Sequence, residues 1–169
     1  VAQLDWSTSD GLSVLQVVNF PGNPSADSSV GFVGGNQGFG NTGQVFAGDQ
    51  SLRDYRIDAQ VYLYRRAGAG SGTNTGILGR VIPGDVAFKG YLLSADFDGN
   101  NRLRLRKFSG RDATSPPDVI RDWGSDEIPG GSLAESGWHK LSLEFKGDEI
   151  YPYFNDALLP DAPFVDTTA

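Results

Sequence analysis

The sequence predicts an all-β protein, a sandwich or a barrel, with almost no helix. Turn-forming residues are frequent: 23 of the 169 residues are Gly and 9 are Pro. Together with Asn, Asp and Ser they divide the chain about every 8–12 residues, a spacing typical of such folds. No segment of helical length keeps apolar residues at positions i, i+3, i+4 and i+7 without an intervening Gly or Pro.

The first long strand is predicted at residues 55–65, where apolar and polar side chains alternate. Such a period of two indicates a strand with one buried face. Residues 66–76 are rich in Gly, Ser and Thr and predict a loop with little to bury. The same criteria predict the other strands at 12–20, 29–34, 43–47, 77–82, 90–98, 102–109 and 118–123.

Two interpretations fit the acidic segment that begins at Asp96. Its oxygen-bearing side chains, Asp96, Asp98, Asn100 and Asn101, are of the kind that bind Ca²⁺. A hairpin with a three-residue loop at 99–101 instead sets Asp98 opposite Arg102, Asp96 opposite Arg104 and Ser94 opposite Arg106. Carboxylates paired with arginines across strands are already satisfied, so the sequence favours the hairpin. We expect no cofactor, with a structural calcium ion as the alternative.

The clearest element is a hairpin over residues 137–156. Gly147 and Asp148 suit a two-residue type II′ loop, because Gly takes the positive φ of its first position. The register then sets Lys146 opposite Glu149, Phe145 opposite Ile150, Glu144 opposite Tyr151, Ser142 opposite Tyr153 and Leu141 opposite Phe154. One face is apolar and the other is polar with tyrosines, and a slip of one residue would mix them.

Composition limits the class of protein. The net charge of −7 argues against non-specific binding to nucleic acid or anionic lipid. No stretch approaches the roughly 20 apolar residues of a membrane span. The chain has no Cys and no Met and begins at Val1, so we expect a leader-processed protein or a piece of a longer one. We predict one domain over residues 1–169, in an extracellular or cell-surface location.

Catalytic patterns are weak. No strand carries the alternating acids of a sandwich glycosidase, and Glu144 is alone on its strand, where it is a surface acid that is solvated or paired with Tyr151. His139 shares the parity of the apolar Leu141 and is expected in the core or at its rim. Trp123 and Trp138 are assigned to structure, with Trp123 the more exposed of the two.

Outward-facing tyrosines are the remaining candidate site. Tyr62 and Tyr64 lie two residues apart on one strand, as do Tyr151 and Tyr153 on another. Aromatic rings stack on the C–H faces of sugars, and neighbouring polar groups bond their hydroxyls. We predict a carbohydrate-binding surface of these four tyrosines, with Asp96 and Arg104 as polar partners. The alternative is that the tyrosines pack at the rim of sheets that loops cover.

Four segments carry a family resemblance: 51–61, 89–96, 102–108 and 137–151. Over about residues 43–168 the chain resembles the concanavalin A-like lectin and glucanase superfamily, closest to laminin G-like domains and the keto-disaccharide hydrolase-like domains of secreted bacterial proteins. The resemblance implies a two-sheet antiparallel jelly-roll sandwich that binds carbohydrate, sometimes with a structural calcium. Some relatives are glycosidases or lyases, but their paired acids have no match here.

The family pattern continues with one more strand where this sequence ends. A sandwich without that strand would expose a pairing edge, so we expect it in a continuation of the chain or from another subunit, by self-association through an open sheet edge. The sequence thus favours a non-catalytic extracellular carbohydrate-binding or adhesion module. The alternatives are a subunit of an extracellular filament or surface assembly, and a polysaccharide hydrolase or lyase.

Overall fold

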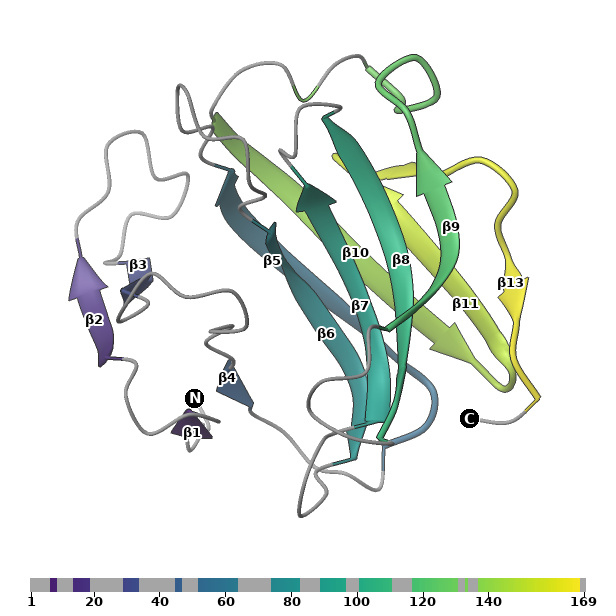
Figure 1. The fold of residues 1–169 in the computed structure, drawn as a ribbon, viewed down its shortest axis with the longest axis horizontal. Coiled ribbons are helices and arrows are strands. Elements are labelled where there is room, and N and C mark those ends of the chain that lie inside the picture. Colours follow the sequence, from purple (N-terminus) through teal and green to yellow (C-terminus); the bar gives the residue numbers. More distant parts are fainter. Residues whose placement is uncertain are drawn as a thin grey trace. The chain divides into compact units, whose positions relative to one another are not determined.

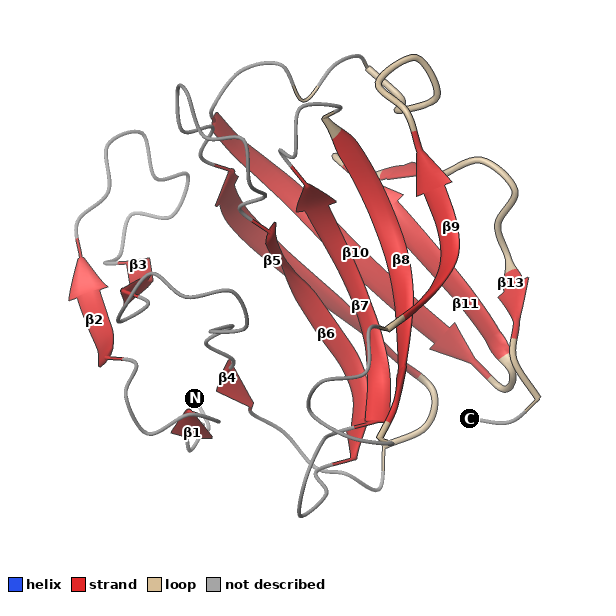
Figure 2. Ribbon diagram, viewed as in Figure 1, coloured by secondary structure: helices blue, strands red, loops and turns tan. Residues whose placement is uncertain are grey.

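The structure, a computed structural model, describes residues 52–63, 74–82, 89–96, 101–110, 117–130, 133 and 137–167, and the backbone of four short strands before them. All described elements are strands (Figure 2). They include no helix long and apolar enough to cross a membrane. The predicted all-β class is confirmed for this part of the chain.

The chain separates into two units, residues 1–50 and 51–169. In the first unit the strands form two antiparallel pairs: β1 (Ser7–Thr8) with β4 (Val45–Phe46), and β2 (Val14–Val18) with β3 (Ser29–Val33). The strands predicted at 12–20, 29–34 and 43–47 are therefore confirmed. A single domain over the whole chain stays a prediction.

The second unit holds two antiparallel sheets (Figure 1). The first runs in the order β12 (Ala157–Leu158), β11 (Glu149–Phe154), β10 (Gly137–Lys146) and β5 (Tyr55–Leu63), and β13 (Phe164–Val165) also pairs with β11. The second runs in the order β6 (Asn74–Ile82), β7 (Lys89–Asp96), β8 (Arg102–Ser109) and β9 (Asp118–Trp123).

The hairpin of β10 and β11 has the predicted register, with Phe145 opposite Ile150 and Glu144 opposite Tyr151. Gly147 has φ 54°, the positive value that the first position of a type II′ turn requires. On the other side β10 pairs with β5 along the whole of that strand, with Leu141 opposite Ala59. Turn chemistry and alternation therefore specify the same register.

The predicted register of β7 and β8 is wrong by two residues. Asp96 lies opposite Arg102 and Ser94 opposite Arg104, so the connection spans residues 97–101. Asn101 takes the left-handed φ of 48° just before β8. A shift of two keeps every side chain on its predicted face, so the apolar pattern does not distinguish the two registers. Asp98 lies outside the described residues.

The predicted loop at 66–76 is wrong at its end, because β6 begins at Asn74. Gly76 explains the error. A Cβ built there would lie 2.2 Å from the carbonyl oxygen of Leu93 on β7, so the residue that signalled a loop instead allows two strands to approach closely.

The apolar faces of the two sheets share one core, as in a β-sandwich. Phe145 of the first sheet lies 5.9 Å from the ring of Tyr91 in the second, centroid to centroid, and Gly79 of β6 lies against the same phenylalanine. In Figure 1 the strands β6 to β9 lie in front of β10 and β11. Buried leucines fill the layer between: Leu93, Leu103, Leu105, Leu141 and Leu143.

Trp123 is fully buried, whereas Trp138 is partly exposed, so the predicted order of exposure is wrong. A β-bulge is the reason. The register between β8 and β9 shifts between Leu105 and Arg106, and Trp123 consequently faces the core beside Leu103. Its indole Nε1 donates to the carbonyl of Pro160 at 3.1 Å.

The segment after β11 connects the two sheets. Its strand β13 pairs with β11 of the first sheet, and the carboxylate of Asp166 accepts a hydrogen bond from the Tyr91 hydroxyl of the second sheet at 2.7 Å. Lys107 of β8 forms an ion pair with the same oxygen. Asp166 also donates its backbone N–H to the carbonyl of Asp148 at 2.9 Å. The segment of residues 164–166, here called the clasp, therefore links the two sheets.

Candidate functional site

The outer face of the first sheet, here called the tyrosine face, carries most of the predicted site. Because side chains alternate along strands, the residues between the core positions point away from the second sheet. These are Arg56, Asp58, Gln60 and Tyr62 of β5, Trp138, Lys140, Ser142 and Glu144 of β10, and Tyr151 and Tyr153 of β11.

Two aromatic groups lie at separate positions along this face. Tyr62 is opposite Trp138, and their rings meet edge to face with centroids 5.4 Å apart. Tyr153 is opposite Ser142, four positions further along β10, which corresponds to about 13 Å at the usual rise of a strand. Tyr64, the fourth predicted tyrosine, lies outside the described residues.

Charged neighbours bond both tyrosines of the second aromatic group, Tyr151 and Tyr153. The Arg56 guanidinium lies 4.4 Å from the ring centroid of Tyr153, and the hydroxyl of Tyr153 donates to Glu144 at 2.8 Å. Tyr151 instead donates to Glu149 at 2.6 Å. Glu144 therefore bonds Tyr153 along the diagonal of the hairpin, and Tyr151, which is opposite Glu144 as predicted, bonds Glu149 on its own strand. The hydrogen bond of Glu144 to Tyr151, one of the two alternatives for this acid, is wrong.

Asp58 lies at the centre of the polar part of the tyrosine face. It accepts a hydrogen bond from the Ser142 hydroxyl at 2.7 Å and forms ion pairs with Arg56 at 3.0 Å and Lys140 at 3.3 Å. The bond from Ser142, followed by those from Arg56 and Lys140, lowers the pKa of Asp58 to about 2. This carboxylate is charged at any ordinary pH and acts as a hydrogen-bond acceptor.

The four carboxyls with a resolved pKa shift, Asp58, Asp122, Glu127 and Glu144, all have a lowered pKa. The pKa of Glu144 is lowered by Lys146 and then by Tyr153. Burial raises the pKa of Asp122, but hydrogen bonds from Arg102 and Arg104 outweigh it and the net shift is downward. A glycosidase acid needs a raised pKa.

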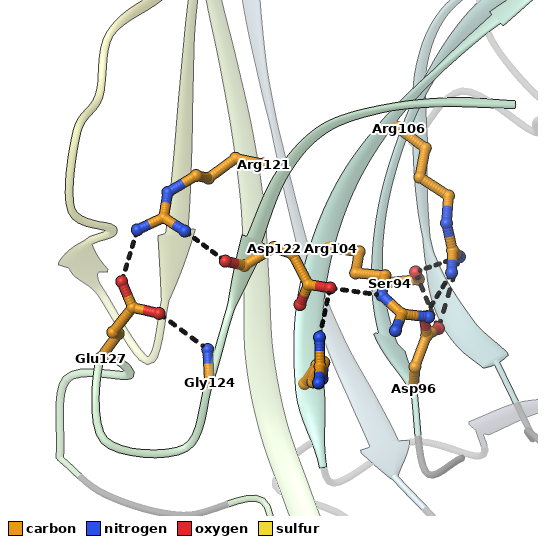
Figure 3. Close-up of polar contacts among 9 residues, drawn as sticks. Ser94, Asp96, Arg104, Arg106, Arg121, Asp122, Gly124 and Glu127 are labelled. Atoms are coloured by element: carbon orange, nitrogen blue, oxygen red, sulfur yellow. Dashed lines mark hydrogen bonds and ion pairs between the residues drawn. The ribbon is translucent and has the colours of Figure 1, made fainter. Parts of the chain in front are cut away.

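The outer face of the second sheet, here called the arginine face, carries the other predicted residues (Figure 3). It consists of Ser94 and Asp96 of β7, Arg102, Arg104 and Arg106 of β8, and Asp122 of β9. Asp96 is fully buried and forms ion pairs with Arg104 at 2.5 Å and with Arg106. Asp122 accepts from Arg102 at 2.8 Å and from Arg104 at 3.1 Å.

The predicted site therefore divides between two surfaces. Tyr62, Tyr151 and Tyr153 lie on the tyrosine face, whereas Asp96 and Arg104 lie on the arginine face. The two sheets share a core through their opposite faces, so these outer faces point in opposite directions. Trp138, which the sequence analysis assigned to structure, also lies on the tyrosine face, as its parity with Lys140 and Ser142 indicated.

Metal binding finds no support in the ranges that the structure describes, where no three acidic or histidine side chains cluster to hold an ion. Asp96, the first residue of the predicted calcium segment, is engaged by two arginines. Asp98 and Asn100 lie outside those ranges. The absence of a cofactor stays a prediction.

His139 lies on the apolar side of β10, as predicted. Its ring stacks on Phe154 with centroids 5.0 Å apart, and its Nδ1 is 3.3 Å from the side-chain nitrogen of Asn155. Burial lowers its pKa below the usual 6.5. The neutral imidazole is therefore a packing group of the core rim.

No protein-family model, curated protein or solved structure matches this chain.

Proposed function

We propose that the chain is a non-catalytic, extracellular carbohydrate-binding or adhesion module, lectin-like, with a concanavalin A-like jelly-roll fold. The observation that carries the proposal is the tyrosine face. It presents Tyr62 and Trp138 at one position and Tyr151 and Tyr153 at another, on a single sheet.

The chemistry of this face suits sugars. Aromatic rings stack on the C–H surface of a pyranose, and the charged and amide groups between the two aromatic positions bond its hydroxyls. Gln60 and Lys140 lie in this intermediate region, and Asp58 lies next to it, level with Tyr153. Two aromatic positions along one face suit an oligosaccharide, because each can contact a different sugar unit.

The charges of the tyrosine face favour a neutral ligand. Arg56 and Lys140 are balanced by Asp58 and Glu144 on the same strands, and Arg56 and Lys140 form ion pairs with Asp58. A face whose charges are satisfied by each other contributes directional hydrogen bonds without a strong field. Specificity would then come from hydroxyl geometry and not from ligand charge.

A glycan array tests the proposal. We expect the protein to bind a subset of neutral oligosaccharides and Tyr62→Ala to lose that binding. Val119→Ala is the control, because Val119 is 54% exposed on β9 of the other sheet. Absence of binding by the wild type, or equal binding by Tyr62→Ala, would reject the tyrosine face as the binding surface.

A structural subunit that assembles by strand addition is the second candidate, and one feature of the sheet edges favours it. Among the described strands, β6 and β9 are sheet edges with irregular registers, and bulges of this kind hinder edge-to-edge pairing. β5 pairs with β10 over nine positions without a shift and has no second partner among the described strands.

An unbulged edge of this length can accept another strand. Light scattering over a wide range of protein concentration tests this candidate. Assembly would appear as a molar mass that rises with protein concentration. A monomer mass at every concentration would reject assembly by strand addition.

A further inference from the structure

The arginine face carries a row of five alternating charges, of which Figure 3 labels Arg106, Asp96, Arg104 and Asp122. Asp96 forms ion pairs with Arg106 and Arg104, and Asp122 bonds Arg104 and Arg102. The order along the row is therefore Arg106, Asp96, Arg104, Asp122 and Arg102. Each carboxylate is shared by two arginines, and the row both begins and ends with a cation.

The two terminal arginines differ in environment. Arg106 is nearly buried, with 11% of its side chain exposed, and it also donates to the Ser94 hydroxyl at 3.0 Å. Arg102 has 37% of its side chain exposed. Within the described residues it donates through Nη1 alone, to Asp122 at 2.8 Å. Its Nε and Nη2 donors have no described partner.

Two acceptor oxygens next to Arg102 also lack a partner. In the described part of the chain, the buried side-chain atoms without a hydrogen bond are Oδ1 of Asn101 and Oδ1 of Asp122. Asn101 directly precedes Arg102 in the chain, and Asp122 is its ion-pair partner. Buried polar atoms are nearly always hydrogen-bonded, so two unmatched acceptors beside one arginine indicate a missing donor.

We propose that Arg102, Asp122 and Asn101 form a binding site for a hydroxylated carboxylate. The ligand carboxylate would accept from the free edge of the Arg102 guanidinium, whose planar donors match it in two-point geometry. A neighbouring hydroxyl would bond Asp122 Oδ1 through a water that enters beside this buried atom. The bound anion extends the alternation of charges by one.

This chemistry is shared by a uronic acid unit of an acidic polysaccharide and by a free sugar acid. The site lies on the sheet face opposite the tyrosine face and does not depend on the function proposed there. Asp122 keeps its charge, since its pKa is lowered overall, so it accepts a hydrogen bond from this water and repels a second carboxylate. This restricts the ligand to a single anionic group at the site.

Isothermal titration calorimetry tests the site with glucuronate, glucose, acetate and a uronic acid oligomer. We expect glucuronate to bind about tenfold or more tightly than glucose or acetate, because a hydrogen bond to a charged group contributes at least that factor. A larger affinity for the oligomer identifies a polysaccharide source, and equal affinity identifies the free acid.

Variants assign the effect to Arg102. Arg102→Gln should weaken glucuronate binding by about tenfold or more, whereas Arg53→Gln, the same change at an exposed arginine outside the arginine face, should leave it unchanged. Equal affinity of Arg102→Gln and wild type would overturn the proposal, as would the absence of glucuronate binding.

A measurement on the wild type tests the site without relying on the fold of a variant. In nitrogen-15 spectra that detect arginine Nε–H groups, we expect glucuronate to shift the Arg102 signal and glucose to leave it in place. If glucuronate moves no signal of Arg102, the site does not exist as proposed.

Discussion

Replacing Gly79 with alanine tests the face-to-face packing of the two sheets. A Cβ at this position would lie 2.4 Å from Cε2 of Phe145, whereas carbon atoms in contact are usually about 3.5–4.0 Å apart. The ring would therefore have to move by about 1 Å. It is 1% exposed and lies between the rings of Tyr55 and Tyr91, at centroid distances of 5.2 and 5.9 Å.

The expected loss follows from two opposing effects. Overfilling a packed core costs about 1–3 kcal/mol, and removal of glycine flexibility from the unfolded chain offsets about 0.4–1 kcal/mol. We expect Gly79→Ala to lower the free energy of unfolding by about 1–2 kcal/mol. For a chain of this length that corresponds to a fall in Tm of about 2–8 °C.

Gly137→Ala is the matched control, because the nearest atom to its Cβ is Nε2 of His139 at 3.7 Å, an ordinary contact. Urea denaturation and thermal melts should show this variant within about 0.5 kcal/mol of wild type. The proposed packing is refuted if Gly79→Ala is as stable as wild type, or if both variants lose the same stability.

Three further predictions concern the clasp and two titrating groups. Asp166→Ala should lower the free energy of unfolding by about 1–3 kcal/mol, because it leaves the buried Tyr91 hydroxyl without its acceptor. Asp161→Ala, a change at a more exposed residue, should lower it by under about 1 kcal/mol when both variants are measured by urea denaturation. Equal losses would argue against the clasp. The single histidine, His139, should titrate below pH 6.5 in proton NMR. The free energy of unfolding should fall as pH decreases below 6.5, because the partly buried imidazole resists protonation. A titration midpoint at or above pH 6.5 would contradict the burial of His139. Asp58 has a depressed pKa of about 2, so its contribution to the free energy of unfolding, under about 1 kcal/mol at this exposed site, should be present above pH 4 and lost as pH falls to 2. Over that pH range Asp58→Asn should lose less stability than wild type. An equal loss in the two proteins would exclude the ion pairs of Asp58 as the cause.

Local sequence patterns determined the hairpin of β10 and β11 completely. The Gly147 turn, the apolar alternation and the polar alternation all require one register, and a slip of one residue violates all three. The connection after Asp96 lacked such agreement. Loops of three and five residues leave the same side chains on each face, so alternation does not distinguish them.

The candidate site depends on long-range pairing that a local pattern does not contain. Alternation correctly placed Tyr62, Tyr153 and Asp96 on outer faces, but it does not say which strands share a sheet. Tyr62 joins Tyr153 only because β5 pairs with β10, which is distant in the sequence. Trp123 was misplaced for a related reason, since a bulge inverts the facing of the residues after it.

The central claim is that the tyrosine face binds carbohydrate, and affinity electrophoresis tests it most directly. Wild type, Tyr62→Ala and Val119→Ala would be run through native gels that contain the polysaccharide selected by the glycan array. We predict that wild type and Val119→Ala are retarded and that Tyr62→Ala migrates as in a gel without polysaccharide. Equal retardation of Tyr62→Ala and wild type would contradict the claim.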